Sequence, residues 1–283
     1  MPGSDERKLA KVPTLLADSV VLDLEDGVPA DKKAEARTRV SAALQTLAFA
    51  PGSERAVRIN CVGSGLEHDD LAAILTAPNL EAIVIPKVEH AWHVQLVSSV
   101  IDARAPAGRR SPVRLIACIE SARGLLNAAA IAAADPRLDA LVFASEDYCA
   151  DVGMIRTAHR RELLYARSAV VTAAAAHGLQ AIDLVCIDYK SEAALRAECQ
   201  EGREMGFTGK QAIHPNQIAV IQELFAPRPA EIDYAQRIVA GYTDAVRRGL
   251  GALTVDGKMV DRPVVKWAEK VLARARRAGS LPA

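Results

Sequence analysis

Residues 115–124 read Leu115-Ile116-Ala117-Cys118-Ile119-Glu120-Ser121-Ala122-Arg123-Gly124. The apolar run follows Pro112 and ends abruptly in a carboxylate and then in small residues. This pattern is typical of a fully buried parallel strand that carries an acid at its carboxyl end. We therefore expect a parallel sheet, with Glu120 at the edge where its strands end.

The same design recurs in Leu141-Val142-Phe143-Ala144-Ser145-Glu146-Asp147. Two buried strands that each end in a carboxylate can place two oxygen ligands around one hard cation. The sequence offers no His/Cys cluster, so Mg2+ or Mn2+ suits Glu120 and Asp147 better than Zn2+ does. The alternative is that both acids are solvated strand ends that pair with lysines.

Strand-like apolar runs alternate with helical patterns along most of the chain. Seven strands are expected to begin near residues 20, 56, 82, 114, 140, 181 and 209. Helices are expected at residues 4–17, 31–48, 67–76, 91–103, 122–134, 158–177, 191–205 and 216–224. This alternation predicts an α/β fold with a parallel sheet and crossover helices, and the length of the chain suits a TIM (β/α)8 barrel.

A (β/α)8 barrel needs one strand more than these seven. The chain opens with Met1-Pro2-Gly3 directly before the first helix, at the place where that strand should end. We expect the first barrel strand to be largely truncated, as a start site assigned too late would produce. A barrel that closes differently is the alternative.

The pattern changes in the last part of the chain. Pro227 and Pro229 mark a break before a helix expected at 230–248. An alternating segment then surrounds Asp256-Gly257, which is a strong hairpin signal, and a terminal helix begins at Arg262-Pro263. We expect a barrel domain and a C-terminal helix–hairpin–helix extension, with these bounds: 1–225 and 226–283.

Composition excludes several classes of function. Of 283 residues, 50% are apolar and 25% charged, and Lys+Arg equals Asp+Glu at 35 each. The chain therefore has no global field that would attract nucleic acid or an anionic membrane. Five cysteines without a C-x-x-C pair suit a reducing compartment, and neither a signal-peptide core nor a membrane-spanning run is present. We expect a cytoplasmic protein.

Reactive groups of a parallel barrel gather at the carboxyl ends of its strands. Polar or ionisable residues follow nearly every expected strand: Asp23, Glu25, Asp26, Arg58, Asn60, Lys87, Glu89, Glu120, Glu146, Asp147, Asp188 and His214. We expect the opposite strand ends to be mostly small or apolar. Because scattered surface charge would not favour one end, this asymmetry indicates a site at the carboxyl edge of the sheet.

Several of these cations have two interpretations. Arg58 lies inside an apolar strand, where an unpaired guanidinium is costly. It either forms an internal salt bridge to Asp23 or Glu25 or clamps a substrate carboxylate through its planar fork. His214 before Pro215 is more typical of a structural residue. Four lysines form either a solvated helix face or a phosphate-binding site: Lys8, Lys11, Lys32 and Lys33. The sequence has no P-loop or G-x-G-x-x-G pattern that would indicate a dinucleotide-binding or NTP-binding fold.

Taken in order, these residues resemble the citrate lyase β-subunit-like branch of the HpcH/HpaI aldolase superfamily, which includes citramalyl-CoA and malyl-CoA lyases. The resemblance covers essentially the whole chain, and its last two motifs are highly specific. The motifs are Pro2–Asp5, Val21–Gly27, Val57–Asn60, Ile85–Glu89, Ile119–Ala122, Glu146-Asp147, Gln180–Asp183 and Gly206–Gln217. This chain departs from the family in one respect: family members have a first strand before the Pro-Gly pair, and that strand supplies a contact to CoA, whereas here only Met1 precedes Pro2-Gly3.

The resemblance implies a Mg2+-dependent TIM-barrel lyase, with Mn2+ able to substitute, that is usually a homotrimer. Such an enzyme cleaves or forms the carbon–carbon bond between acetyl-CoA and a 2-oxo acid, pyruvate or glyoxylate. With thioester hydrolysis it would act as a malate or citramalate synthase. Its partners would be small molecules rather than nucleic acid or membrane.

The resemblance also assigns roles to residues. Glu120 and Asp147 would ligate Mg2+, and Arg58 would bind the 2-oxo acid carboxylate. Asp261 matches the catalytic acid that the C-terminal segment carries, typically into a neighbouring subunit. The contacts to CoA would come from Arg7, Lys11 and the backbone at Ile213 and His214. The residues expected around these groups are Asp23, Glu25, Asp26, Lys87 and Glu146.

Three other functions stay open. The chain could be the β subunit of a citrate lyase complex that acts on an acyl-carrier-protein thioester. It could be a class II aldolase that acts on free 2-oxo acids and has no use for Arg7 and Lys11. It could also be a non-catalytic CoA-binding scaffold.

Overall fold

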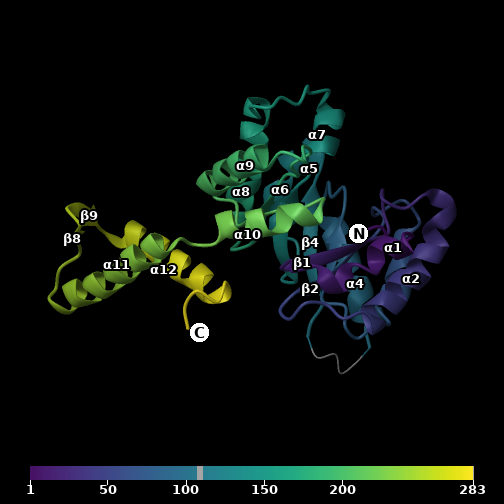
Figure 1. The fold of residues 1–283 in the computed structure, drawn as a ribbon, viewed down its shortest axis with the longest axis horizontal. Coiled ribbons are helices and arrows are strands. Elements are labelled where there is room, and N and C mark those ends of the chain that lie inside the picture. The colour runs from purple at the N-terminus through teal and green to yellow at the C-terminus, as the bar shows by residue number, and fades with distance from the viewer. Residues whose placement is uncertain (107–110, 283) are drawn as a thin grey trace. The chain divides into compact units, whose positions relative to one another are not determined.

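The computed structural model describes residues 1–106 and 111–282. It divides into two compact units, Met1–Ile221 and Gln222–Ala283. The first unit holds a parallel sheet with helices, and the second holds a helical hairpin with a β-hairpin (Figure 1). Residues 107–110 of the predicted barrel domain and residue 283 of the predicted extension lie outside the described residues.

Seven parallel strands form one sheet in sequential order, which confirms the predicted number and direction of the strands. They are β1 (Ser19–Asp23), β2 (Glu54–Arg58), β3 (Ala82–Ile85), β4 (Arg114–Ile119), β5 (Leu138–Phe143), β6 (Gln180–Asp183) and β7 (Gly209–Lys210). Pro2 bridges in parallel to Asp23 at the outer edge of β1, where the sequence predicts the end of the remaining barrel strand. The first unit is thus an α/β domain of the TIM-barrel type, as expected.

One face of the sheet is lined by a cluster of apolar side chains from six strands. The cluster comprises Val21, Ala56, Ala82, Val84, Ile116, Cys118, Val142 and Ile182. Because successive side chains of a strand point to opposite faces, alternation places Asp23, Arg58 and Glu120 on this same face, where the strands end. We call this end of the sheet the carboxyl edge.

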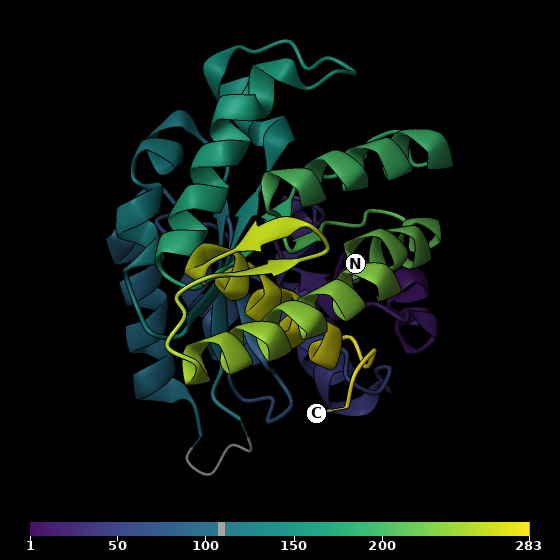
Figure 2. The same ribbon diagram turned by 90° about the vertical axis from the view of Figure 1, so that its left-hand side faces the viewer.

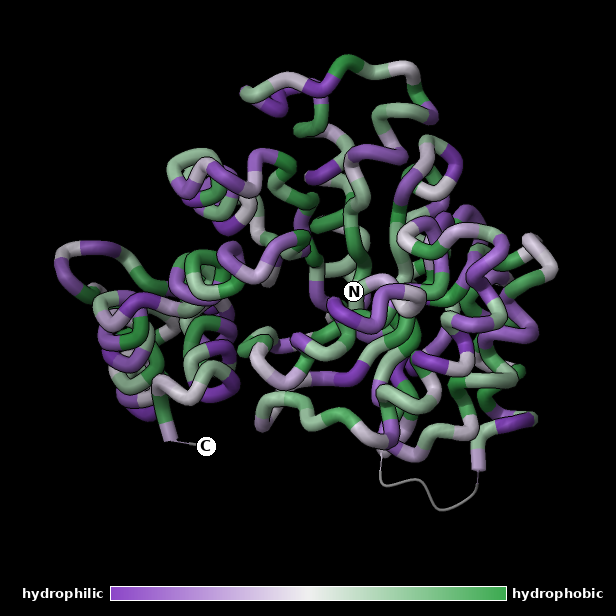
Figure 3. The backbone as a smooth tube through the Cα atoms, turned by 45° about the vertical axis from the view of Figure 1, so that its right-hand side comes forward, coloured by the Kyte–Doolittle hydropathy of each residue, from purple (hydrophilic) through white to green (hydrophobic). Residues whose placement is uncertain are grey.

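Helices lie around these strands (Figure 1), and hydrophobic and hydrophilic residues are interleaved along the chain (Figure 3). The helices are α1 (Glu6–Leu9), α2 (Lys33–Thr46), α3 (Glu67–Ile74), α4 (Ala91–Arg104), α5 (Ala122–Leu126), α6 (Ala128–Ala132), α7 (Ser145–Val152), α8 (Leu164–Ala176) and α9 (Glu192–Met205). The boundary between the two units falls within α10 (Ile218–Phe225). Short 3-10 turns occur at η1 (Val12–Thr14), η2 (Ala30–Lys32), η3 (Arg161–Leu163) and η4 (Pro215–Gln217).

Three predicted elements differ from the structure. The helix expected at 4–17 ends at Leu9, because Pro13 lacks the N–H that would donate to the carbonyl of Leu9. The helix expected at 122–134 breaks at Asn127, whose side chain donates to the carbonyl of Glu89 at 2.8 Å. The strand expected to begin near residue 209 has only two residues, Gly209 and Lys210.

A further difference concerns Asp147. The sequence predicts this residue at the end of a strand, but it lies in the first turn of α7, a helix that was not predicted. Gly153, with a φ of 67°, ends this helix in the left-handed conformation. Such a glycine is a common helix terminator, so it was a sequence signal for α7.

The second unit contains α11 (Pro229–Arg247), β8 (Leu253–Val255), β9 (Lys258–Val260) and α12 (Arg262–Arg277). Asp256 and Gly257, which both have a positive φ, form the predicted turn between two antiparallel strands (Figure 2). Apolar residues of α11 and α12, among them Ile238, Val265 and Leu272, form a core of their own. Within the described residues, no helix is long and apolar enough to cross a bilayer.

Candidate active site

Arg58 and Asp23 are neighbours in register at the ends of β2 and β1. The carboxylate of Asp23 accepts hydrogen bonds from Nε and Nη2 of Arg58, both at 2.7 Å. The backbone N–H groups of Glu25 and Gly27 also donate to Asp23, each at 2.9 Å. Burial opposes the negative charge, but the hydrogen bonds from Arg58 outweigh it and hold the pKa of Asp23 below its usual range.

The internal salt bridge predicted for Arg58 is therefore present. Nη1 of Arg58 also lies 3.2 Å from Oε2 of Glu25. A guanidinium carries five N–H groups, and the hydrogen bonds to Asp23 use two of them. The remaining N–H groups of Arg58 are thus available to a second carboxylate. The salt bridge is therefore compatible with the interpretation that Arg58 binds a substrate carboxylate.

Lys87 joins the same cluster from the segment that follows β3. Its φ is 50°, in the left-handed region that is uncommon for a residue with a side chain. The ammonium group contacts the carboxylate of Glu25 and lies 2.7 Å from Oδ2 of Asp26. Burial works against this charge, but hydrogen bonds to Asp26 and Glu25 raise the pKa of Lys87 above its ordinary value. Lys87 and Arg58 thus share the buried Glu25.

Glu120 follows β4 and is buried, with 4% of its surface exposed. Burial, and then the charges of Asp147 and Glu25, raise the pKa of this carboxyl to about 7, against the opposing effect of Lys87 and Arg58. Among the described residues, Glu120 has no salt-bridge partner, whereas Asp147 is exposed at the first turn of α7. A buried carboxylate therefore faces further negative charge without a matching cation.

The carboxylates of the carboxyl edge are not all paired with cations. Arg58 and Lys87 pair with Asp23, Glu25 and Asp26, whereas the described residues give Glu120 and Asp147 no ion pair. A divalent cation would neutralise the charges of these last two. Since Arg58 and Lys87 occupy the other three acids, Glu120 and Asp147 are the pair best suited to hold one.

The donor set fits Mg2+. In the part of the chain that the structure describes, no three His, Cys, Asp or Glu side chains converge on one point. Zn2+ in proteins is almost always held by at least three such ligands. Mg2+ is commonly bound by one or two carboxylates together with water and substrate oxygens. Glu120 and Asp147 could therefore hold Mg2+ while leaving positions for a substrate.

Glu146, expected around the metal ligands, pairs with Arg156. The hydroxyl of Ser145 also donates to Glu146 at 3.0 Å, and Nη2 of Arg156 donates to the carbonyl of Val185 at 3.1 Å. Glu146 thus links α7 to the segment after β6. Nothing in the sequence marks Arg156 for this role.

Arg7 and Lys11 are exposed, and among the described residues neither has a side-chain ion pair. Lys8, which lies between them, is paired with Asp5 at 3.4 Å. Two unpaired cations spaced four residues apart are suited to phosphate groups. For Lys33, the solvated-face and phosphate-site interpretations are both wrong. Its ammonium donates to the carbonyls of Leu24 and Glu25 and to the side chain of Asn60.

The backbone at Ile213 and His214 is held by Gln217. Its Oε1 accepts both N–H groups, at 2.9 and 3.2 Å, and its Nε2 donates to the carbonyl of Cys186 at 2.9 Å. The ring of His214 accepts the N–H of Asn216 and caps η4, a structural role of the kind that the sequence favours. A contact to CoA here would fall to carbonyl oxygens, because both N–H groups are used.

Asp261 belongs to the second unit, where it stands at the N-cap position of α12. It is half-buried, and within the described residues its side chain makes no capping hydrogen bond. An aspartate at this position usually caps the helix. Asp261 therefore has a carboxylate that its own helix does not use.

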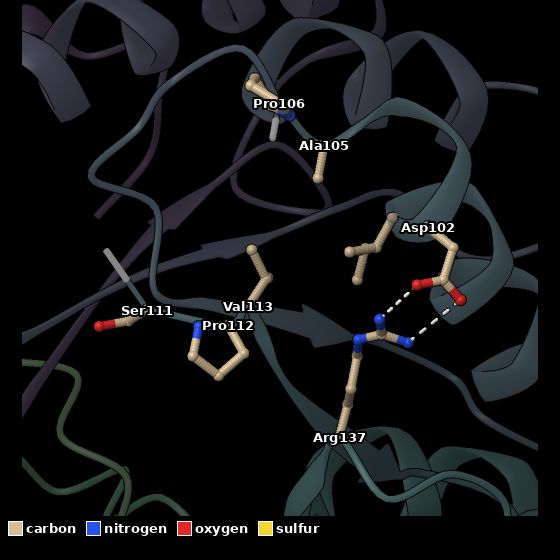
Figure 4. A pocket seen from close by; sticks show the side chains of 8 residues that line it. Asp102, Ala105, Pro106, Ser111, Pro112, Val113 and Arg137 are labelled. Carbon is tan, nitrogen blue, oxygen red and sulfur yellow. Dashed lines mark hydrogen bonds and ion pairs between the residues drawn. The ribbon is translucent and has the colours of Figure 1, made fainter. Parts of the chain in front are cut away.

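A pocket also exists away from the carboxyl edge, beside the starts of β4 and β5 (Figure 4). An ion pair between Asp102 and Arg137 lies along its wall. The other residues that line it are Ile101, Ala105, Pro106, Ser111, Pro112 and Val113. Reactive groups of parallel barrels lie at the other ends of the strands, so we do not assign the chemistry to this pocket.

Two family profiles match the chain. The HpcH/HpaI aldolase/citrate lyase family matches residues 1–215, and a C–C bond lyase family of the TIM-barrel fold matches residues 152–280. The human mitochondrial citramalyl-CoA lyase is 41% identical over 286 residues, covering 97% of this chain and 84% of that protein. A (3S)-malyl-CoA thioesterase of Cereibacter sphaeroides is 38% identical over 275 residues, covering 97% and 92%.

Further relatives include the citrate lyase subunit beta of Leuconostoc mesenteroides subsp. cremoris, 36% identical over 277 residues and covering 97% of this chain and 91% of that protein. Among solved structures, CitE of Mycobacterium tuberculosis in complex with magnesium, acetoacetate and coenzyme A has a TM-score of 0.76 at 33% identity. This match covers 99% of the present chain and 96% of that one. A citrate lyase of Burkholderia xenovorans has a TM-score of 0.78 at 25% identity, covering 92% and 84%.

Proposed function

Because the chain belongs to the HpcH/HpaI aldolase/citrate lyase family and is a carbon–carbon lyase, we propose that it is a Mg2+-dependent lyase of a CoA ester. The substrate would be (S)-citramalyl-CoA or malyl-CoA, and the products acetyl-CoA and pyruvate or glyoxylate. The observation that carries this proposal is the buried, uncompensated Glu120 beside Asp147 and Arg58 at the carboxyl edge. Relatives named citramalyl-CoA lyase and a related structure with magnesium and coenzyme A support it.

Glu120 and Asp147 would hold Mg2+, which supplies a Lewis acid for the oxygens of the 2-oxo or 2-hydroxy acid. Arg58 would bind the carboxylate of this acid through the N–H groups that Asp23 leaves available, as a planar fork that fixes its orientation. Asp23 holds the guanidinium in place from the adjacent strand. These residues together would orient the carbon–carbon bond that breaks.

Asp261 would be the general acid or base that exchanges a proton with the acetyl-CoA carbon. During cleavage the hydroxyl of the 2-hydroxy acid loses its proton to water and becomes the carbonyl of the 2-oxo acid. The electron pair of the carbon–carbon bond passes to the acetyl-CoA carbon, and Asp261, in its protonated form, donates a proton to that carbon. In the synthetic direction Asp261 removes the same proton as a general base. Its carboxylate suits this task because α12 does not use it as a cap.

We also propose an assembly and a location. Residues 1–225 would form the catalytic domain, and residues 226–283 would cap the site of a neighbouring subunit in a homo-oligomer, with a trimer as the expected form. The enzyme would act in the cytoplasm. Analytical ultracentrifugation would test the assembly: a monomer at catalytic concentrations would contradict it.

The test of the function is acetyl-CoA release by the purified protein from citramalyl-CoA and from malyl-CoA, with Mg2+ and with EDTA. We expect Mg2+-dependent release, and the ratio of the two rates would identify the substrate. Equal rates of acetyl-CoA release with and without EDTA would contradict the proposal that the reaction requires Mg2+. If neither ester is cleaved by folded protein, the CoA-lyase proposal fails.

The same assay separates the rival functions. Release of free malate or citramalate from acetyl-CoA and a 2-oxo acid would show synthase activity with thioester hydrolysis, to which the malyl-CoA thioesterase relative points. Turnover only of an acyl-carrier-protein thioester would favour the β-subunit alternative, to which the citrate lyase relative points. Cleavage of free 2-oxo acids alone would favour the class II aldolase.

A further inference from the structure

The proposed metal site draws its two carboxylates from separate segments: Glu120 follows β4, and Asp147 lies in the first turn of α7. The distance between them must be fixed for both to reach one cation. We propose that Asp151 is the positioning residue that sets this distance. This inference rests on the proposed function, because it concerns the same metal site.

Asp151 forms a direct link between the two segments. Its Oδ2 accepts a hydrogen bond of 2.7 Å from the backbone N–H of Ala122, two residues after Glu120. Asp151 also follows Asp147 by one helical turn in α7, so the two side chains share one face of the helix. The hydrogen bond therefore holds the face that carries Asp147 against the segment that follows Glu120.

The segment after Glu120 is itself fixed, so it gives Asp151 a rigid point of attachment. The hydroxyl of Ser121 donates to Oε1 of Glu89 at 2.8 Å and accepts the N–H of Gly124 at 3.1 Å. A side chain at Gly124 would place its Cβ only 2.5 Å from the carbonyl oxygen of Val88. This segment therefore packs closely on the one that follows β3.

The other side of α7 is tied as well. Glu146 in its first turn pairs with Arg156, which donates to the carbonyl of Val185 after β6. α7 is thus held toward β6 through Glu146 and toward β4 through Asp151. The N–H of Ala144, directly before α7, also donates to the carbonyl of Ile119 at 3.1 Å, so this end of the helix stays attached to β4. Removal of the Asp151 link would therefore let α7 turn about this point, and Asp147 would shift relative to Glu120.

A shift of α7 would weaken metal binding. Mg2+ demands near-ideal octahedral geometry with short metal–oxygen distances. Groups that orient the ligands of a metal, without touching it, typically change its affinity about 10- to 100-fold when they are removed. The expected loss for Asp151 is at the low end, because it acts through the backbone.

Mn2+ binding, measured by electron paramagnetic resonance of the free ion, tests this proposal without relying on turnover. We expect Asp151→Ala to weaken Mn2+ binding about tenfold. Asp151→Asn keeps an oxygen that accepts the N–H of Ala122 but loses the charge, so it should bind Mn2+ within about twofold of the natural protein. Asp135→Ala is the matched control. Asp135 accepts a backbone N–H from Arg137 at 2.8 Å near the start of β5, away from the site, and its loss should leave affinity unchanged.

Each outcome has a distinct meaning. Unchanged affinity in Asp151→Ala, or equal weakening in Asp151→Asn, would overturn the positioning role. If Asp151→Ala does not melt cooperatively, Asp151→Glu replaces it: the longer side chain should also weaken Mn2+ binding, and unchanged affinity would overturn the role. Glu120→Gln separates the two proposals. If it binds Mn2+ as well as the natural protein does, the metal site itself is wrong; if it loses binding while Asp151→Ala does not, only the role of Asp151 fails.

Discussion

Asp23 and Arg58 end two adjacent parallel strands and meet through two hydrogen bonds of 2.7 Å. The side chain of Asp23 has 8% of its surface exposed and that of Arg58 has 29%, so this ion pair is largely shielded from water. Such a pair fixes the plane of the guanidinium as well as its position. Asp23 therefore orients the group that we propose as the carboxylate clamp.

Replacement of Arg58 by lysine should reduce kcat/KM for the CoA ester about 100-fold. A lysine keeps the charge but cannot hold Asp23 and a substrate carboxylate through one planar fork, and charge-assisted hydrogen bonds contribute about 1.5–3 kcal/mol each. Steady-state kinetics in both directions would measure the change. Arg114→Lys is the control, because Arg114 forms a similar two-point pair with Asp139 at the opposite end of the strands. Equal losses in both variants would argue against a clamp.

Gly27→Ala should destabilise the first unit by about 1–3 kcal/mol. A Cβ at this position would lie 2.4 Å from Oδ2 of Asp23, which also accepts the N–H of Gly27, so the carboxylate would have to move away from Arg58. Urea unfolding would measure the loss. Gly251→Ala is the control, because a Cβ there meets nothing within 4 Å. A Gly27→Ala protein as stable as this control would contradict the close contact.

Stability without metal should depend on pH through Glu120. Its pKa is raised from 4.5 to about 7, so ionisation of this group costs folding free energy. The cost is absent below pH 4.5, develops up to about pH 7 and then reaches the order of 3 kcal/mol. Glu120→Gln should therefore stabilise the protein at pH 8 and change little at pH 4.5, as urea unfolding in EDTA would show. No stabilisation at pH 8 would mean that the carboxylate ionises without penalty.

Glu120 and Asp147 show how much of the candidate site could be predicted from the sequence. Glu120 could be located because an apolar run that ends in an acid identifies both the strand and its carboxyl end. Asp147 was predicted near it, but in the wrong element, because α7 has only eight residues, Ser145–Val152, and is separated from the end of β5 by one residue, so the strand pattern seemed to continue into it. Strand order followed from the regular alternation, since consecutive parallel strands with crossover helices usually lie side by side.

Other residues could not be found in this way. Asp151, Arg156 and Gln217 act by hydrogen bonds to backbone atoms that are distant in the sequence. Every residue except proline offers the same backbone donor and acceptor, so no sequence pattern shows which of them a side chain will reach. Lys33 shows the converse: it looks like a solvated lysine, yet three acceptors of the fold surround its ammonium.

Substitution of Arg7 and Lys11 by alanine should raise KM for the CoA ester and leave binding of the free 2-oxo acid unchanged. Two exposed cations that face phosphate groups contribute mainly by charge, so we expect an increase of about tenfold that shrinks at high salt. Lys8→Ala is the matched control, because Lys8 lies between them and is already paired with Asp5. Unchanged KM in the double variant would favour the class II aldolase.

Asp261→Asn should abolish most turnover while the protein stays folded. The carboxylate does not cap α12, so its loss should change the free energy of unfolding by less than about 0.5 kcal/mol. General acid–base groups typically contribute about 100- to 10,000-fold to rate, and kcat should fall within this range while Mn2+ affinity stays unchanged. Asp256→Asn is the control. Asp256 lies in the same hairpin unit, and its φ of 50° suits asparagine well, so activity should persist. A fully active Asp261→Asn enzyme would remove the C-terminal acid from the mechanism, whereas parallel loss in Asp256→Asn would show that the hairpin, rather than the carboxylate, is required.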